Sequence, residues 1–202
     1  MQVSPRARLE LSCREQWDFP LHPGFSGQTR GTGVFGMSLT NTISNYDPAW
    51  PAEFSEEAAR LTPVFISSLV TIHHVCSTSV PDLMAKPEID LMVVVEDTGE
   101  ADQWTATLVD LGYRRGGDLS PRHLFYKKDM NGVRTRKIHV CRSGHDAINR
   151  MLRFRNHLRQ RPETRKNYQE LKLELERENS SGIQEYLEGK ARFIEDVLSR
   201  DT

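Results

Sequence analysis

Apolar residues recur every three or four positions from Trp50 to Leu69, which predicts one amphipathic helical stripe. Pro63 falls inside this stripe, and because proline lacks an amide proton we expect it to kink or interrupt the helix. The next apolar segment, Thr71–Val75, is short and typical of a strand. Glu88–Val95 is rich in β-branched residues and almost wholly apolar after Asp90, a composition typical of a strand buried on both faces.

The pattern continues with a helix, a hairpin and a helical end. A helix is predicted over Ala101–Leu111, with Gly112 in the position after its last turn. Asn131-Gly132 is a strong hairpin signal, and it joins the predicted strands Arg122–Lys127 and Val133–Val140. Beyond this hairpin the spacing predicts helices over about 145–160, 162–178 and 184–199.

Residues 1–40 differ from the rest of the chain. They hold five of the thirteen glycines and three of the ten prolines, with no regular period, so we expect a flexible N-terminal extension that folding does not require. Met37 is a plausible alternative start. The remainder is expected to form a core over residues 41–142, followed by a helical segment over residues 143–202 that packs on it.

Length and composition narrow the class of protein. The 202 residues suit one domain with an appendage. No run of about 18 apolar residues occurs, so a membrane-spanning helix is not expected, and the first residues lack the apolar core of a signal peptide. Three cysteines without CxxC spacing argue against a disulfide framework. We therefore expect a cytoplasmic protein without a membrane partner, and the oligomeric state stays open.

Charge is nearly balanced over the chain, with a formal net charge of −1, but it is segregated along it. Residues 82–110 contain eight acids and one base, and residues 112–142 contain nine bases and two acids. Most of these side chains are expected on solvated strands and turns. A few could line a pocket for phosphate. The near-neutral balance does not predict sequence-specific binding of nucleic acid.

The candidate chemistry lies between the first two predicted strands. One strand ends in Ser77, Thr78 and Ser79, and Asp90 stands near the start of the next strand. Small hydroxyl residues let a triphosphate approach the backbone, where N–H and O–H groups can bind it. A carboxylate at a strand edge can hold the Mg²⁺ that neutralises phosphate charge. The alternative interpretation is an ordinary turn followed by a capping acid.

Several ordered motifs carry a family resemblance. They are Tyr46-Asp47-Pro48-Ala49-Trp50, the stretch from His73 to Leu91, Gly112-Tyr113, Arg134–Val140, Leu152–Pro162, Tyr168–Lys172 and Tyr186–Ile194. Together they resemble the GrpB family, also found as an extension of some dephospho-CoA kinases, over about residues 45–198. The resemblance implies an α/β (α+β) fold, with a nucleotidyltransferase-like mixed sheet core followed by a C-terminal helical segment.

The resemblance also implies site residues and a cofactor. Ser77 matches the serine that such transferases use for the triphosphate, and Asp90 matches their first metal carboxylate, which implies Mg²⁺ or Mn²⁺. A second metal carboxylate would stand two residues further on, where this chain has Met92. His139 falls where a third would stand.

Basic and aromatic positions extend the expected pocket. Lys86 is the one base in the acidic stretch, and it either binds phosphate or pairs with a neighbouring acid. Lys172 and Lys190 each follow a tyrosine by four residues, so the helical segment either closes over the pocket or presents two amphipathic edges there. The candidate ligand-binding residues are Ser77, Thr78, Ser79, Lys86, Arg122, Arg134, Tyr168, Lys172 and Lys190.

The chain departs from the family pattern at Cys76 and Asp82, where the family has glycine. A side chain at Cys76 crowds the backbone approach that glycine permits. His74 and Cys76, with His139 and Cys141, form two His-x-Cys pairs on predicted strands, and their convergence would make a zinc site. Alternatively the histidines bind phosphate or a core carbonyl, and the cysteines are small buried hydrophobic residues.

A further interpretation makes Cys76 a nucleophile activated by His74 or His73. The candidate catalytic residues are therefore Asp90, His139, His74 and Cys76.

Three functions follow from these residues. The first is a divergent, metal-dependent transferase that acts on a nucleotide or another phosphorylated small molecule. The second is a binding module that kept the pocket and lost catalysis. The third is an enzyme that uses the pocket on a non-nucleotide metabolite through Cys76 and the nearby histidines.

Overall fold

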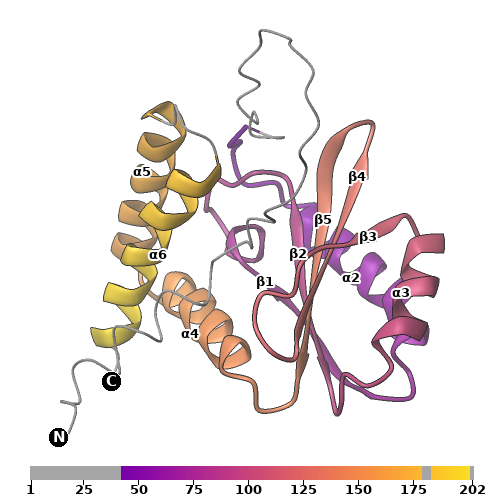
Figure 1. Cartoon of the computed structure of the whole chain (residues 1–202). Coiled ribbons are helices and arrows are strands. Elements are labelled where there is room, and N and C mark those ends of the chain that lie inside the picture. Colours follow the sequence, from indigo (N-terminus) through magenta and orange to yellow (C-terminus); the bar gives the residue numbers. More distant parts are fainter. Residues whose placement is uncertain (1–41, 179–182, 201–202) are drawn as a thin grey trace, which may run out of the picture.

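The structure is a computed structural model that describes residues 42–178 and 183–200; the predicted extension, residues 1–40, lies outside them. Its order of elements alternates helices and strands and then becomes purely helical (Figure 1). The elements are α2 (Trp50–Leu61), β1 (Leu69–Val75), β2 (Ile89–Val95), α3 (Ala101–Asp110), β3 (Tyr113–Arg115), β4 (His123–Met130), β5 (Val133–Arg142), α4 (Asp146–Gln160), α5 (Pro162–Glu178) and α6 (Ile183–Arg200).

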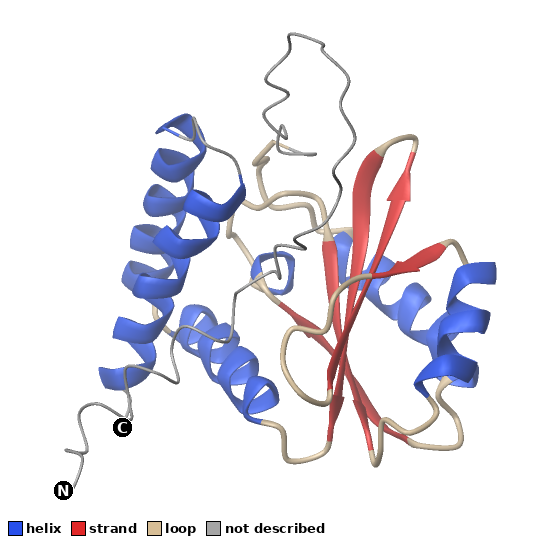
Figure 2. Ribbon diagram, viewed as in Figure 1, coloured by secondary structure: helices blue, strands red, loops and turns tan. Residues whose placement is uncertain are grey.

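One mixed sheet forms the centre of the molecule, with the strand order β1-β2-β5-β4-β3 (Figure 2). β2 and β5 are parallel neighbours, and the other pairs are antiparallel. β2 has a strand on each side and all of its residues are buried, as its β-branched composition predicts. The α/β fold class with a C-terminal helical part is therefore confirmed.

The two faces of the sheet are covered by different helices (Figure 1). Alternate residues of β2, such as Leu91 and Val93, point into a core that includes Trp104 of α3 and Leu61 of α2. The other face carries Asp90, Met92 and Val94, and its apolar part packs against Ala147 of α4. Asp90 thus belongs to the face on which α4, α5 and α6 lie.

The helical part packs on the loop that follows β1. Val80 and Leu83 of that loop share an apolar cluster with residues from all three C-terminal helices, among them Phe154 (α4), Tyr168 (α5) and Leu198 (α6). The loop is consequently held between the sheet and the helices. No helix in the described ranges is long and apolar enough to cross a membrane.

Turn predictions hold where backbone chemistry is distinctive. Asn131 and Gly132 have φ values of 53° and 79°, as the predicted hairpin requires. The predicted stripe from Trp50 to Leu69 is not one helix: α2 ends at Leu61, and Pro63 lies in a 3₁₀ turn. The sequence pattern misses β3, because it has only three residues and two of them are arginines.

Candidate functional site

Asp90 is the centre of the candidate site, on the sheet face toward the helical part. It is directly opposite Lys137 in the parallel register of β2 and β5. His139 follows Lys137 by two residues and so shares its face of the sheet. The Asp90 Oδ1 atom lies 3.9 Å from Lys137 Nζ and 3.8 Å from His139 Nε2.

These neighbours keep Asp90 ionised. Burial would raise the pKa of its carboxyl, but the Lys137 ammonium, the neighbouring His139 and the charge on Lys190 outweigh burial and lower the pKa below its usual value. Glu88, buried and two residues before Asp90, forms an ion pair with the same Lys137 ammonium. The site therefore contains a second carboxylate, on the other side of Asp90 from the Met92 position considered above.

The loop after β1 has three hydroxyl side chains, and one of them is directed at the helical part. The Thr78 hydroxyl donates to the carbonyl of Glu88 at 3.2 Å, and the Ser79 hydroxyl donates to the carbonyl of Cys76 at 2.5 Å. Those two hydroxyls thus hold the loop together. The Ser77 hydroxyl instead lies 3.4 Å from Lys172 Nζ. Of the predicted serine and threonine ligands, Ser77 is the one directed at the lysines.

Two arginines of α4 fix this loop from outside. Arg155 donates to the carbonyl of His74 at 2.8 Å, and Arg159 donates from two nitrogens to the carbonyl of Ser79 at 3.0 and 2.6 Å. Because guanidinium groups hold both ends of the turn, the helical segment positions Ser77 relative to Asp90.

The helical part brings two further lysines to this place. Lys172 of α5 is buried, and burial together with the charge on Lys190 lowers its pKa to about 7. Burial and the charge on Lys137 lower the pKa of Lys190, on α6, to about 8. Neither ammonium group has enough water or negative charge around it to stay fully protonated. Such surroundings are typical of a site that binds an anion.

Tyrosines and Lys86 complete the lining. Lys172 Nζ lies 5.1 Å from the ring centroid of Tyr168, and Lys190 Nζ lies 4.5 Å from that of Tyr186. Lys86 Nζ is 5.1 Å from the Tyr186 ring, on the side where it also pairs with Glu176 at 3.2 Å. The tyrosine–lysine pair of α5 thus lies at the Ser77 loop, and the pair of α6 lies beside Lys86.

The structure does not bring the four predicted zinc ligands together. His74 is opposite Leu91, on the other face of the sheet from Asp90, and its ring stacks on Phe54 of α2 at 4.7 Å. Burial lowers the pKa of His74 to about 4. His139 and Cys141 share the Asp90 face, because both follow Lys137 by even steps along β5.

Cys76 has a thiol that stays protonated. The residue is exposed, and its thiol is close enough to Asp90 for that charge to act on it. Desolvation and the charge on Asp90 raise the pKa of the thiol well above its usual value. No hydrogen bond joins it to His73 or His74 among the described residues. The chemistry of an activated thiolate has no support in this geometry.

Arg122 and Arg134 lie away from the predicted pocket. The carbonyl of Arg122 accepts from the amide of Arg142, five residues along β5 from Lys137, which corresponds to about 17 Å of strand. Arg134 pairs with Asp129 near the hairpin turn at 2.6 Å.

The sequence analysis missed three residues of the site, Lys137, Glu88 and His123. Lys137 and Glu88 could have been found, since each lies two residues from a predicted site residue on a predicted strand. His123 on β4 could not, because the pairing of β4 with β5 places its Nε2 atom 3.0 Å from His139 Nδ1.

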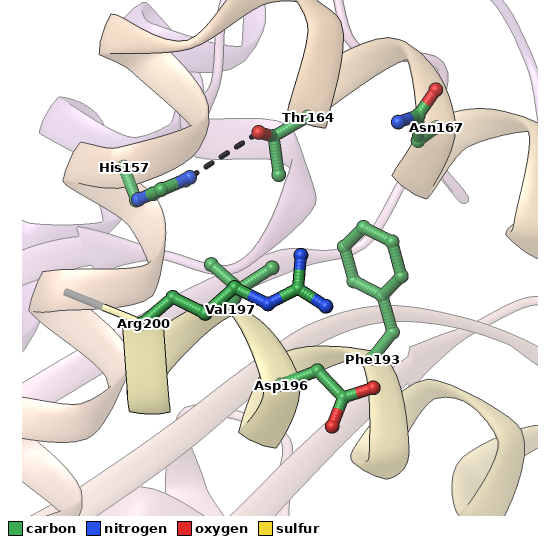
Figure 3. A pocket seen from close by; sticks show the side chains of 7 residues that line it. All are labelled: His157, Thr164, Asn167, Phe193, Asp196, Val197 and Arg200. Carbon is green, nitrogen blue, oxygen red and sulfur yellow. Dashed lines mark hydrogen bonds between the residues drawn. The ribbon is translucent and has the colours of Figure 1, made fainter.

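A separate hollow lies between the C-terminal helices. It has a volume of about 220 Å³ and is lined by His157 of α4, Thr164 and Asn167 of α5, and four residues of α6 (Figure 3). None of the predicted site residues lines it.

Three known proteins are similar to this chain over most of its length. A GrpB protein of Enterococcus faecalis has a crystal structure that matches with a TM-score of 0.72 and 29% identity, over 79% of this chain and 98% of that one. A UPF0157 protein of Halalkalibacterium halodurans is 34% identical over 162 residues, 79% of this chain and 81% of the relative. A dephospho-CoA kinase of Mycolicibacterium paratuberculosis is 25% identical over 179 residues, which cover 44% of that protein.

The family model described as GrpB protein matches residues 40–200, which include every described element of the sheet and the helical part. The match contains the loop at Ser77, the Asp90 strand and both tyrosine–lysine pairs. This chain therefore belongs to the GrpB family.

Proposed function

We propose that the pocket between the sheet and the helical part binds the phosphate groups of a nucleotide or a similar phosphorylated small molecule, and that the chain transfers a nucleotidyl group from it. The observation that carries this proposal is the pair of lysines with lowered pKa, buried Lys172 and half-buried Lys190, beside Ser77 and Asp90. A phosphate between them would supply the negative charge that their surroundings lack.

The remaining groups have complementary roles. Ser77 and the amides of its loop would donate to phosphate oxygens, and the rings of Tyr168 and Tyr186 would bound the pocket on the helical side. In nucleotidyl transfer an acceptor oxygen forms a bond to the α-phosphorus while the bond to pyrophosphate breaks. In this proposal Asp90 would take the acceptor's proton, and His139, 3.8 Å from its carboxylate, would orient it.

The acids of the site fit a divalent cation in chemistry. Asp90 and Glu88 offer the carboxylate oxygens that Mg²⁺ and Mn²⁺ prefer, so Asp90 is the first ligand that we propose. A bound cation would neutralise phosphate charge and polarise the phosphorus–oxygen bond. Lys137 already contacts both carboxylates, and a metal ion would compete with it.

That contact favours a second candidate function. Lys137 stands where a cation would stand, so the pocket could bind a phosphorylated ligand without metal and without transfer. In this binding module the ammonium of Lys137 takes the neutralising part of the metal's role.

Titration calorimetry with ATP distinguishes the candidates. The transferase predicts tighter binding with Mg²⁺ or Mn²⁺ than with a chelator, loss of that difference in Asp90→Asn, and release of pyrophosphate in the presence of an acceptor. Equal affinity with metal and with chelator, without pyrophosphate release, would identify the binding module. Absence of binding in every condition would contradict both.

A further inference from the structure

Three potential metal ligands meet at the end of the sheet next to α4. They are His123 of β4, Cys141 of β5 and His145 in the turn before α4, and one ligand atom of each lies within 4.8 Å of the other two. His123 and Cys141 are directly opposite each other in the antiparallel register of their strands, so their side chains share a face. His123 and Cys141 are buried, and His145 is half-buried.

The His123 ring has a buried nitrogen that makes no hydrogen bond among the described residues. Its residue is 4% exposed, and Nδ1 has no hydrogen-bond partner among the described residues. Its other nitrogen, Nε2, lies 3.0 Å from His139 Nδ1, and His139 Nε2 lies 3.8 Å from Asp90 Oδ1. When His123 Nε2 donates to His139 Nδ1, His139 carries its own proton on Nε2, the ring atom nearest to Asp90.

The order of protons in this chain leaves a lone pair on His123 Nδ1. A buried lone pair without a donor is an unsatisfied polar group, which proteins rarely keep. A histidine whose second nitrogen donates to a further acceptor is the usual arrangement of a metal ligand.

We propose that His123, Cys141 and His145 bind a zinc ion. Imidazole nitrogen and thiolate sulfur are the ligands that Zn²⁺ prefers, and a tetrahedral site needs one more ligand. The hydroxyl of Ser120 lies 3.1 Å from His145 Nε2, so this hydroxyl or a water molecule beside it is suited to the fourth position.

The adjustments that the ion requires are small. Bond lengths of about 2.0–2.3 Å place tetrahedral ligand atoms about 3.3–3.8 Å apart, so the cluster must contract by about 1 Å. His145 Nδ1 now accepts from the amide of Ala147 at 3.1 Å, and binding through Nε2 would move the ring proton to Nδ1 and end that contact. The Ala147 amide lies in the first turn of α4, where water can replace the acceptor. The Cys141 thiol loses its proton to the solvent when the metal binds.

This site differs from the four-residue zinc site suggested by the sequence and from the proposed phosphate site. It shares Cys141 with the four-residue set suggested by the sequence, but it uses His123 and His145 in place of His74, Cys76 and His139. It also does not depend on phosphate binding, because its ligands lie at the far end of the histidine chain from Asp90. The zinc ion would hold β4, β5 and the start of α4 together.

Metal titration of the full chain tests the proposal. The metal-stripped protein is titrated with Zn²⁺ against a chromophoric chelator, and separately with Co²⁺, whose absorption spectrum reports thiolate ligation and tetrahedral geometry. Cys141→Ser removes the thiolate, and His145→Asn removes the imidazole while asparagine still caps α4. Cys76→Ser is the matched thiol control.

The parent and Cys76→Ser are expected to bind one Zn²⁺ per chain, and the parent should show the thiolate-to-cobalt charge-transfer band. Cys141→Ser and His145→Asn should each weaken Zn²⁺ binding by at least about 100-fold. Circular dichroism shows whether the variants are folded. Absence of the charge-transfer band in the parent, or equal Zn²⁺ affinity in the parent and both folded ligand variants, would overturn the proposal.

Discussion

The backbone at Cys76 has φ 59° and ψ −162°, a region that glycine occupies and residues with a Cβ atom rarely do. The family resemblance implies glycine at this position, and glycine would occupy this region without strain. Arg155 and Arg159 hold the carbonyls of His74 and Ser79, on either side of Cys76, and thus keep the backbone in this conformation. A side chain here also reduces the room for phosphate beside Ser77.

Cys76→Gly should therefore stabilise the fold. Relief of strain is worth about 1–3 kcal/mol, and the greater freedom of glycine in the unfolded chain offsets about 0.5–1 kcal/mol of it. We expect a net gain of about 1 kcal/mol in the free energy of unfolding, measured by urea denaturation. Cys76→Ala, which removes the thiol but keeps Cβ, is the control and should gain little. An equal gain in both variants would trace the effect to sulfur and not to the backbone.

Lys172 gives the second prediction at this scale. Its pKa is lowered to about 7 in the fold, so between pH 7 and its ordinary pKa the unfolded chain binds more protons than the folded one. Stability from this residue therefore rises with pH across that interval, and at pH below 7 the cost of burying the charge is fully present.

Lys172→Met should remove that pH dependence and stabilise the protein near pH 7 by at least about 1.4 kcal/mol, the value of one pKa unit. Urea denaturation at pH 6, 7.5 and 9 measures both effects. A variant less stable than the parent at all three values would mean that the contacts of the ammonium with Met84 and Ser77 outweigh the desolvation of the charge.

At the scale of single residues, the sequence predicted the polar centre and missed its neighbours. Asp90, His139 and Ser77 were identified from motif order, and the structure places the first two 3.8 Å apart. His74 was assigned to the same place because it adjoins Cys76 in sequence, but alternation along β1 directs it to the opposite face. Such a distinction needs the strand register, which one sequence does not contain.

Among the elements, the contact between α5 and α6 depends on Gly189. A Cβ atom at this position would come within 2.6 Å of a side-chain carbon of Leu175, closer than carbon atoms pack. α6 carries Lys190 and Tyr186, so its approach to α5 sets how these residues face the pocket.

Gly189→Ala should consequently loosen α6, although alanine is the better helix former. Overpacking of this kind costs about 1–3 kcal/mol, more than the gain of about 0.5–1 kcal/mol from helix propensity. Thermal unfolding followed by circular dichroism measures the difference. Adding Leu175→Ala should restore part of the lost stability, and a double variant no better than Gly189→Ala alone would show that Leu175 is not the obstacle.

At the level of elements, the sequence predicted the helices, strands and turns that hydrophobic periodicity and turn residues determine. β2, the Asn131-Gly132 hairpin and the three C-terminal helices are confirmed near their predicted bounds. β3 was missed because three residues carry no measurable period, and its strand exists through pairing with β4. The end of α2 just before Pro63 agrees with the expected interruption, and the apolar stripe continues past it on residues that pack into the same core.

For the whole molecule, the sheet and the helical part both contribute residues to the candidate site. The sheet supplies Asp90, His139 and Lys137, and the helices supply Lys172 and Lys190. The sequence alone left two interpretations equally open. Either the helical segment closes over the pocket, or its two tyrosine–lysine pairs are amphipathic edges. Electrostatic coupling of Lys190 to Lys137 and Asp90 favours closure.

This arrangement predicts how ligand affinity depends on pH. Phosphate binds the protonated lysines, whose pKa values in the free protein are about 7 and about 8, so binding should take up protons at pH 8. Affinity for tripolyphosphate should fall as the pH rises from 7 to 9. Calorimetry in buffers of different ionisation enthalpy measures the uptake, and proton release on binding would exclude these lysines as the anion ligands.

The most direct measurement is calorimetric titration of tripolyphosphate into the parent, Lys172→Met and Lys166→Met at pH 7. Lys166 is the matched control, because it lies on the same helix with 74% of its side chain exposed. If α5 delivers a phosphate ligand to the pocket, Lys172→Met should weaken binding at least about tenfold, the effect of 1.4 kcal/mol, and Lys166→Met should bind as the parent does. Equal affinity in the parent and Lys172→Met would contradict the assignment of this pocket to phosphate.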